Sequence, residues 1–195
     1  LGDVYKRQSF DKGGKTSYME DITRAFLDGR KLITSANGEK LTDAQRSELM
    51  GYVAIISENW QKVIAESVFK YAGSTYKSLV AVEDVINDDL AKEFSKYMKY
   101  WGELKGFSMA LQVGKDNIGE SATKLNRMIG FGPMLMDETQ IIGIDSKGNY
   151  IMDKIYSMND AKLHMLKIQK LMIDEFGVEA KSNDMLAEMA DLASK

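Results

Sequence analysis

The sequence predicts an all-α protein, an antiparallel helical bundle with a small β-hairpin insertion near 140–152. Only one proline occurs in 195 residues, and Ala, Leu, Lys, Glu and Met are abundant, a composition that favours helices. Apolar residues recur at helical spacing over most of the chain, and this pattern is interrupted once by two short apolar runs around a polar turn. The length allows one domain with a sizeable core.

The first eight residues, LGDVYKRQ, fit no structural element and resemble one reading frame of the mosaic-end adaptor used in transposase-based sequencing libraries. We therefore expect 1–8 to be an adaptor artefact. We expect 9–17 to be a disordered lead-in, 18–177 to be the helical-bundle domain, and 178–195 to be a tail helix.

The first half of the domain predicts four helices. The first spans 18–33, with acidic residues early and basic residues late, as the helix dipole prefers. Thr42 and Gln45 form a capping box that opens a long helix, which we expect to end near Gly73. A shorter helix is expected over 75–86, and Asn87 is expected to cap another that runs to Gln112.

The second half predicts a short helix over 123–129, a loop over 130–134 that holds the proline, and a hairpin around the turn DSKGN. Because an isolated two-stranded ribbon is marginal in water, we expect the ribbon to lie against the helices. Ser157 or Asn159 begins a further amphipathic helix that Gly177 closes.

Gly102 and Gly106 lie four residues apart inside a predicted helix. A helical glycine costs about 1 kcal/mol relative to alanine. We therefore expect another backbone to approach this helix closely, at Gly106 more than at Gly102.

The composition limits the function. No cysteine is present, which excludes disulfides, thiolate catalysis and cysteine-ligated metals. The net charge is −3 and no cluster of basic residues stands out along the sequence, so we expect no nucleic-acid partner. No apolar run approaches the roughly 20 residues that a membrane-spanning helix needs.

The candidate ligand-binding residues are few. Glu103 and Lys105 lie beside Trp101, where a partly buried charge would suit a ligand carboxylate or a proton donor. The alternative is that Glu103 pairs with Lys99, one turn earlier on the helix. Arg30 could bind a carboxylate or phosphate, or could tie one helix to another.

His164, the only histidine, lies four residues after Asp160, which is the geometry of two metal ligands on one helical face. No third ligand is visible nearby in the sequence, so we interpret the pair as structural and identify no metal or other cofactor. We expect the methionines at helical spacing to pack in the core rather than to hold a soft metal or haem; they are Met50, Met98, Met109, Met128, Met134, Met136, Met165 and Met172.

Two stretches, AFLDGRKLI at Ala25–Ile33 and YWGELKGFSMALQ at Tyr100–Gln112, are followed by GFGPML. Together they resemble the C-terminal half of an uncharacterised family of imelysin-like helical lipoproteins from Gram-negative cell envelopes. The resemblance covers most of 18–135 and does not include the hairpin. It implies a lipid anchor in the full-length protein, a location in the periplasm or outer membrane, and an envelope protein as partner.

The resemblance favours a non-catalytic binding or scaffold protein. The alternative is an imelysin-type iron- or haem-linked protein. We expect its ligands to lie mainly in the family's N-terminal half, which this sequence lacks, because the G-x-H-x-x-E motif of imelysin relatives does not occur here. A hydrolase has the least support, since one histidine and no cysteine leave mainly carboxylate chemistry.

Overall fold

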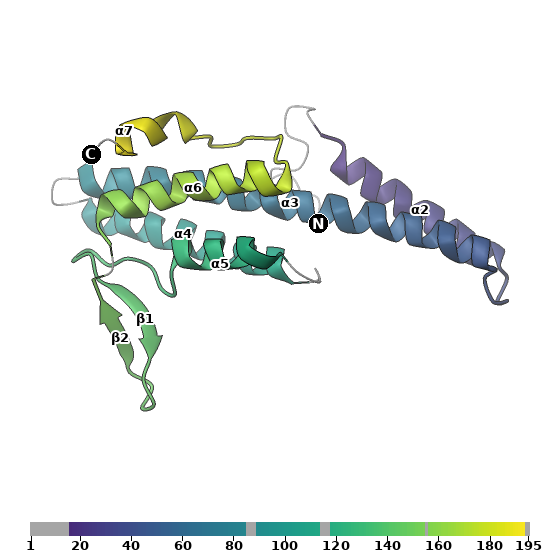
Figure 1. The fold of residues 1–195 in the computed structure, drawn as a ribbon, viewed down its shortest axis with the longest axis horizontal. Coiled ribbons are helices and arrows are strands. Elements are labelled where there is room, and N and C mark those ends of the chain that lie inside the picture. The colour runs from purple at the N-terminus through teal and green to yellow at the C-terminus, as the bar shows by residue number, and fades with distance from the viewer. Residues whose placement is uncertain (1–15, 85–88, 114–117, 155, 194–195) are drawn as a thin grey trace. The chain divides into compact units, whose positions relative to one another are not determined.

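The structure, a computed structural model, describes residues 16–84, 89–113, 118–154 and 156–193. It confirms an all-α helical bundle with one small antiparallel ribbon (Figure 1). The elements are α2 (Tyr18–Ser35), α3 (Asp43–Asp84), α4 (Leu90–Gln112), α5 (Gly119–Ile129), β1 (Gln140–Ile144), β2 (Tyr150–Asp153), α6 (Met158–Phe176), the short 3₁₀ helix η2 (Leu186–Glu188) and α7 (Met189–Ala193). The predicted adaptor artefact, 1–8, and most of the predicted lead-in, 9–17, lie outside the described residues. So does Asn87, the predicted cap of the fourth helix.

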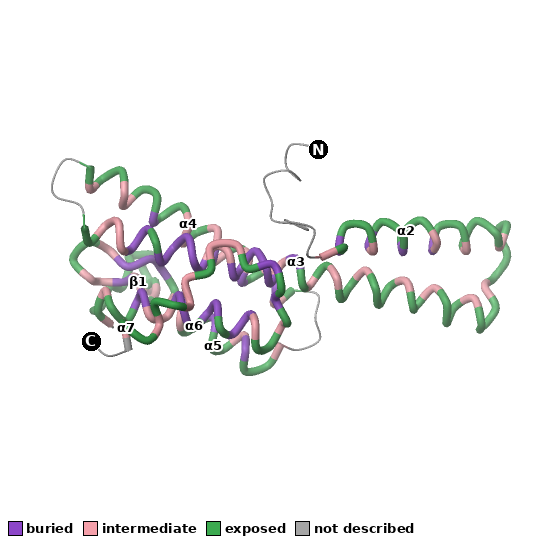
Figure 2. The backbone as a smooth tube through the Cα atoms, turned by 90° about the horizontal axis from the view of Figure 1, so that it is seen from above, coloured by how far each residue is buried: buried purple, intermediate pink, exposed green. Residues whose placement is uncertain are grey.

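The chain divides into two compact units, 1–64 and 65–195, which we call unit 1 and unit 2. Helix α3 contributes its first part to unit 1 and its second part to unit 2. Buried positions are concentrated in unit 2, whereas unit 1 buries only a narrow strip where α2 faces α3 (Figure 2). Among the described residues, no helix combines the length and the apolar content that crossing a membrane would require.

Unit 1 is a helical hairpin with a single seam. Helix α2 buries one residue per turn at alternating spacings of four and three, which are Tyr18, Ile22, Ala25 and Gly29. A methyl group on Gly29 would lie 3.4 Å from Leu49 and 3.6 Å from Tyr52, so this glycine lets α2 approach α3. The predicted capping box opens α3: the backbone N–H of Gln45 donates to Thr42 Oγ1 at 3.2 Å, and the N–H of Thr42 donates to Gln45 Oε1 at 2.9 Å.

Unit 2 encloses the core. The second part of α3 packs with α4, α5 and α6. The fully buried side chains of this core come from all four helices and include Phe69, Leu79, Leu104, Leu125, Ile129, Leu166, Ile168 and Met172. The predicted caps of α6 are confirmed and the alternatives are settled: Ser157, not Asn159, is the N-cap, in a capping box with Asp160. Gly177 closes the helix in the left-handed conformation.

The expected break at Gly73 is wrong, because α3 continues as one helix to Asp84 and no separate helix begins at Thr75. Gly73 is instead a crossing point. A methyl group there would lie 1.9 Å from the backbone oxygen of Asn183 and 2.6 Å from Gln169 Nε2. The glycine is required because the tail backbone passes directly over the helix.

Buried hydrogen bonds secure this crossing. Gln169 is fully buried and donates to the carbonyls of Phe69 at 3.0 Å and Asn183 at 2.8 Å. It also accepts from the backbone N–H of Met185 at 2.9 Å. Asn183 Nδ2 donates to Ser74 Oγ at 2.9 Å. The C-terminal tail therefore docks on α3, and its helical part is confined to η2 and α7.

The ribbon forms where the sequence predicts it, with antiparallel pairing from Gln140–Asp153 to Ile144–Tyr150 and an irregularity between Ile141 and Gly143. The expectation that it lies against the helices is wrong for most of its length. Only its base is fully buried, at Gln140, and the ribbon projects from the helices (Figure 1). Every residue of β2 is exposed, including Ile151 and Met152.

The methionine expectation is only partly right. Met134, Met165 and Met172 are buried in unit 2. Four of the methionines expected in the core are exposed to solvent, namely Met50, Met98, Met109 and Met136. Helical spacing identified the type of element, but it did not identify which apolar stripe faces the core.

Candidate functional site

Three side chains spaced four residues apart on α4 hold the segment that follows α5. Trp101 Nε1 donates to the carbonyl of Ile129 at 3.1 Å, and Lys105 Nζ donates to the carbonyl of Gly130 at 2.6 Å. One turn earlier, Tyr97 Oη accepts from the backbone N–H of Met134 at 2.8 Å. We call Tyr97, Trp101 and Lys105 the α4 row.

Two members of the α4 row donate hydrogen bonds to backbone carbonyls at the end of α5, which have no partner within that helix. The last carbonyls of an α-helix have no partner within the helix, and a cation near this end is favoured by the helix dipole. Trp101 and Lys105 supply a donor and a positive charge at the end of α5. Burial lowers the pKa of Lys105 from its ordinary value.

Gly130 and Gln140 fix the other side of this segment. Gly130 has φ +81°, and a methyl group on it would meet the Gln140 side-chain amide at 2.2 Å. Gln140 is buried and donates from Nε2 to the carbonyl of Gly132 and to Tyr156 Oη, both at 2.7 Å. The chain between α5 and the ribbon is thus held on both sides.

Glu103 faces α3 rather than Lys99. Burial, together with the interaction of the Tyr71 hydroxyl with the Glu103 carboxylate, raises the pKa of Tyr71. The ring of Tyr71 stacks on Phe107 with centroids 5.3 Å apart, and Lys70 Nζ lies 4.9 Å from the Tyr71 ring centre. Lys99 instead lies over the ring of Tyr100. The Glu103 carboxylate, which the sequence suggested for ligand binding, instead interacts with α3 from α4.

The packing expected at Gly102 and Gly106 is wrong. Both glycines are exposed, and a methyl group on either would have no atom outside its own helix within 4 Å. Trp101 and Lys105 share one side of α4, whereas Glu103 points from the same helix towards α3, and Arg30 is an exposed residue of α2 in unit 1.

Asp160 caps the start of α6, and His164 packs on an aromatic ring. The Asp160 carboxylate accepts from the backbone N–H of Ser157 at 3.1 Å and from its hydroxyl at 2.9 Å, and these bonds lower the pKa of Asp160. The His164 ring lies edge-on to Tyr156, with centroids 5.0 Å apart. Burial and Lys167 lower the pKa of His164, and Asp160 partly offsets this effect. Within the described residues, no group of three or more His, Asp or Glu side chains is placed to hold a metal ion.

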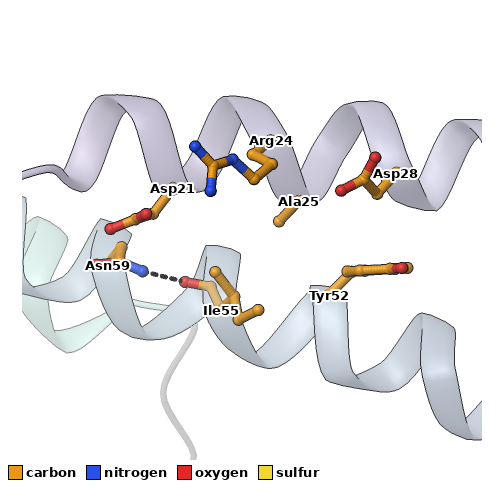
Figure 3. A pocket seen from close by; sticks show the side chains of 7 residues that line it. All are labelled: Asp21, Arg24, Ala25, Asp28, Tyr52, Ile55 and Asn59. Carbon is orange, nitrogen blue, oxygen red and sulfur yellow. Dashed lines mark hydrogen bonds between the residues drawn. The ribbon is translucent and has the colours of Figure 1, made fainter.

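A groove of about 400 Å³ in unit 1 runs between α2 and α3, lined by Asp21, Arg24, Ala25, Asp28, Tyr52, Ile55 and Asn59 (Figure 3). Its polar side chains bond within their own helices. Ser17 donates to Asp21 at 2.7 Å, and Tyr52 donates to Glu48 at 2.8 Å. Arg24 pairs with Glu20, Asp28 pairs with Lys31, and Asn59 donates to the carbonyl of Ile55. These contacts leave an open polar groove with no converging acid and base.

A second groove, of about 370 Å³, lies between α5 and α6 in unit 2 and is basic. It is lined by Met128 and Leu171 together with Lys124, Arg127, Lys167, Lys170 and Asp174. Lys170 pairs with Asp174 at 2.7 Å. The basic residues come from two helices, which is why no basic cluster is visible along the sequence. Lys124 also pairs with Glu120, at 3.6 Å, and the positive charges of the groove exceed the negative ones, which favours an anionic ligand.

The sequence pointed to Trp101, Glu103 and Lys105 but missed Tyr97, Gln140 and Gln169, which complete the polar framework. The spacing of four between Tyr97, Trp101 and Lys105 was a visible signal that they share a helical face. Comparisons with protein-family models, with curated proteins and with solved structures find no match to this chain.

Proposed function

We propose that this chain is part of a non-catalytic binding or scaffold protein of the cell envelope, anchored by lipid when full length. The observation that carries the proposal is the use of Trp101, Glu103 and Lys105 within the fold. Each of these side chains holds another element in place, so the segment richest in candidate chemistry serves as a framework.

The location rests on the resemblance of Ala25–Ile33 and Tyr100–Gln112 to imelysin-like envelope lipoproteins. The basic groove between α5 and α6 provides a binding surface for an envelope protein with an acidic segment. The proposed partner is therefore a protein rather than a small substrate.

The proposal is tested with the full-length gene, expressed in a Gram-negative host with a C-terminal epitope tag. Cells are fractionated and labelled with radioactive palmitate. We expect the tagged protein in the envelope fraction with incorporated label. Unlabelled protein confined to the cytoplasmic fraction would contradict both the location and the anchor.

The iron- or haem-linked alternative is distinguished by titrating the purified full-length protein with ferrous iron and with haem. Stoichiometric binding of either one would favour this alternative over a scaffold. A protein that binds neither, but that cross-links to an envelope protein through the basic groove, would favour the proposal.

A further inference from the structure

Unit 1 leaves large apolar side chains exposed on one side of its hairpin. On α2 they are Met19, Phe26 and Ile33. Met19 and Phe26 directly follow Tyr18 and Ala25, two of the buried residues that face α3, which we call seam positions. Ile33 lies two helical turns after Phe26, on the same side of the helix. On α3 they are Met50, Val53 and Trp60, which follow Leu49, Tyr52 and Asn59. We call these six side chains the apolar face.

The two helices place these residues on the same side. In an antiparallel pair of right-handed helices, the residues that follow the seam positions lie on one side of the pair, and those that precede them lie on the other. The polar groove confirms this geometry, because Asp21, Asp28 and Ile55 precede Ile22, Gly29 and Ile56 and together line one groove (Figure 3). The apolar face is therefore the opposite side of the hairpin.

The exposure of this face is large. Phe26 is 61% exposed, Met50 is 63% exposed and Trp60 is 52% exposed. Because a large side chain offers roughly 200 Å² when fully exposed, six that are about half exposed present on the order of 600 Å². Two such faces in contact would bury about 1,200 Å², the lower limit of a stable, specific interface.

The face is also self-complementary. On α2, Met19 and Ile33 lie seven residues to either side of Phe26; on α3, Arg46 and Trp60 lie seven residues to either side of Val53. Gly29 lies between the levels of Leu49 and Tyr52, so Phe26, about one turn earlier on α2, is level with Val53.

We propose that a second copy of this chain covers the apolar face, related by a two-fold axis that lies in the interface, at right angles to the helices, and runs from Phe26 to Val53. Phe26 then packs on Phe26 of the second copy, and Val53 packs on Val53. The same rotation places Ile33 against Met19, and Arg46 over the ring of Trp60, where a guanidinium is favoured. The two hairpins form an antiparallel four-helix bundle whose interface is the same patch on both copies.

The test is the mass of the 195-residue chain by sedimentation equilibrium at about 100 μM, since interfaces of this size often bind in the micromolar range. We expect a dimer that dissociates on dilution. Phe26→Asp should weaken it at least about tenfold, because the substitution places two like charges at the axis. The matched control is Leu27→Asp, since Leu27 is also exposed on α2 but points away from the seam; it should leave the dimer unchanged. Helical circular dichroism of both variants shows that they remain folded.

A mixed sample tests the axis itself. Phe26→Asp and Phe26→Lys chains should pair with each other more tightly than either pairs with itself, because the two residues at position 26 meet. A monomeric parent chain at the same concentration would overturn the proposal and leave the face to a different partner. Equal loss of dimer in the Phe26 and Leu27 variants, or a mixture as monomeric as its components, would also overturn it.

Discussion

The backbone carbonyl of Asn183 lies directly over Gly73, so close that a methyl group on Gly73 would be 1.9 Å from the Asn183 oxygen. This contact joins the C-terminal tail to the middle of α3. Gln169 and Ser74 add hydrogen bonds on either side of it.

Gly73→Ala should therefore destabilise the protein, although alanine is the better helix former. The methyl group must displace the tail backbone or Gln169, and overpacking of this kind costs about 1 to 3 kcal/mol. Urea unfolding measures the loss, and limited proteolysis should show faster cleavage within 178–193. Unchanged stability with an undisturbed tail would show that the tail does not lie over Gly73.

Gly106→Ala should have the opposite effect. Because the site is open, the change removes the cost of a helical glycine and should raise the free energy of unfolding by about 0.5 to 1 kcal/mol. Gly102→Ala should do the same. Destabilisation by either change in the same urea titration would indicate a close contact that is not present in this fold.

Lys162 and Glu83 should respond unequally to mutation. Lys162 is buried and donates to Glu83 at 2.6 Å, whereas the Glu83 side chain is 47% exposed. Glu83→Ala leaves a buried ammonium group without its carboxylate and should cost about 1 to 3 kcal/mol. Lys162→Met leaves a carboxylate that water can reach and should cost less than about 1 kcal/mol. Equal losses in chemical denaturation would contradict this difference in burial.

His164 should make stability depend on pH near neutrality. Its pKa is lower in the folded protein, chiefly because of burial, so the unfolded chain binds more protons between the folded and unfolded pKa values. The contribution of His164 to the free energy of unfolding should be fully present above its unfolded pKa of about 6.5. It should be lost as the pH falls through the folded pKa.

His164 is the only histidine, so His164→Gln should flatten the part of the stability profile that lies just below about pH 6.5. The carboxylates whose pKa is lowered, including Asp137 and Asp160, should lose their contributions at lower pH. A slope that persists in the variant would assign the titration to another group.

The parts of the fold that the sequence predicted are those with local causes. The capping box of Thr42 with Gln45, a helix start at Ser157 (one of two expected positions) and the helix end at Gly177 each depend on residues within one turn of a helix, and all are confirmed. Gly73 was misread because a glycine that ends a helix and one that admits a distant backbone look alike in sequence. Only the placement of Asn183 distinguishes them.

The candidate site shows the same limit. The sequence identified Trp101 and Lys105 as unusual but could not supply their partners, since the carbonyls of Ile129 and Gly130 belong to another helix end. Helical spacing also placed Phe26, Val53 and Trp60 among the apolar residues without showing that the hairpin leaves them exposed. A two-helix hairpin has one seam and cannot cover two sides of each helix.

The α4 row supports the fold by holding the end of α5. The test is the urea-unfolding free energy of Lys105→Met beside that of Lys92→Met, a control on the same helix whose ion pair with Asp89 is exposed, with the charged atoms 3.7 Å apart. Lys105→Met should lose about 1.5 to 3 kcal/mol, the usual contribution of a hydrogen bond from a charged group, whereas Lys92→Met should change stability by less than about 0.5 kcal/mol. Equal, small effects of the two substitutions would contradict the claim and return Lys105 to the group of candidate ligand-binding residues.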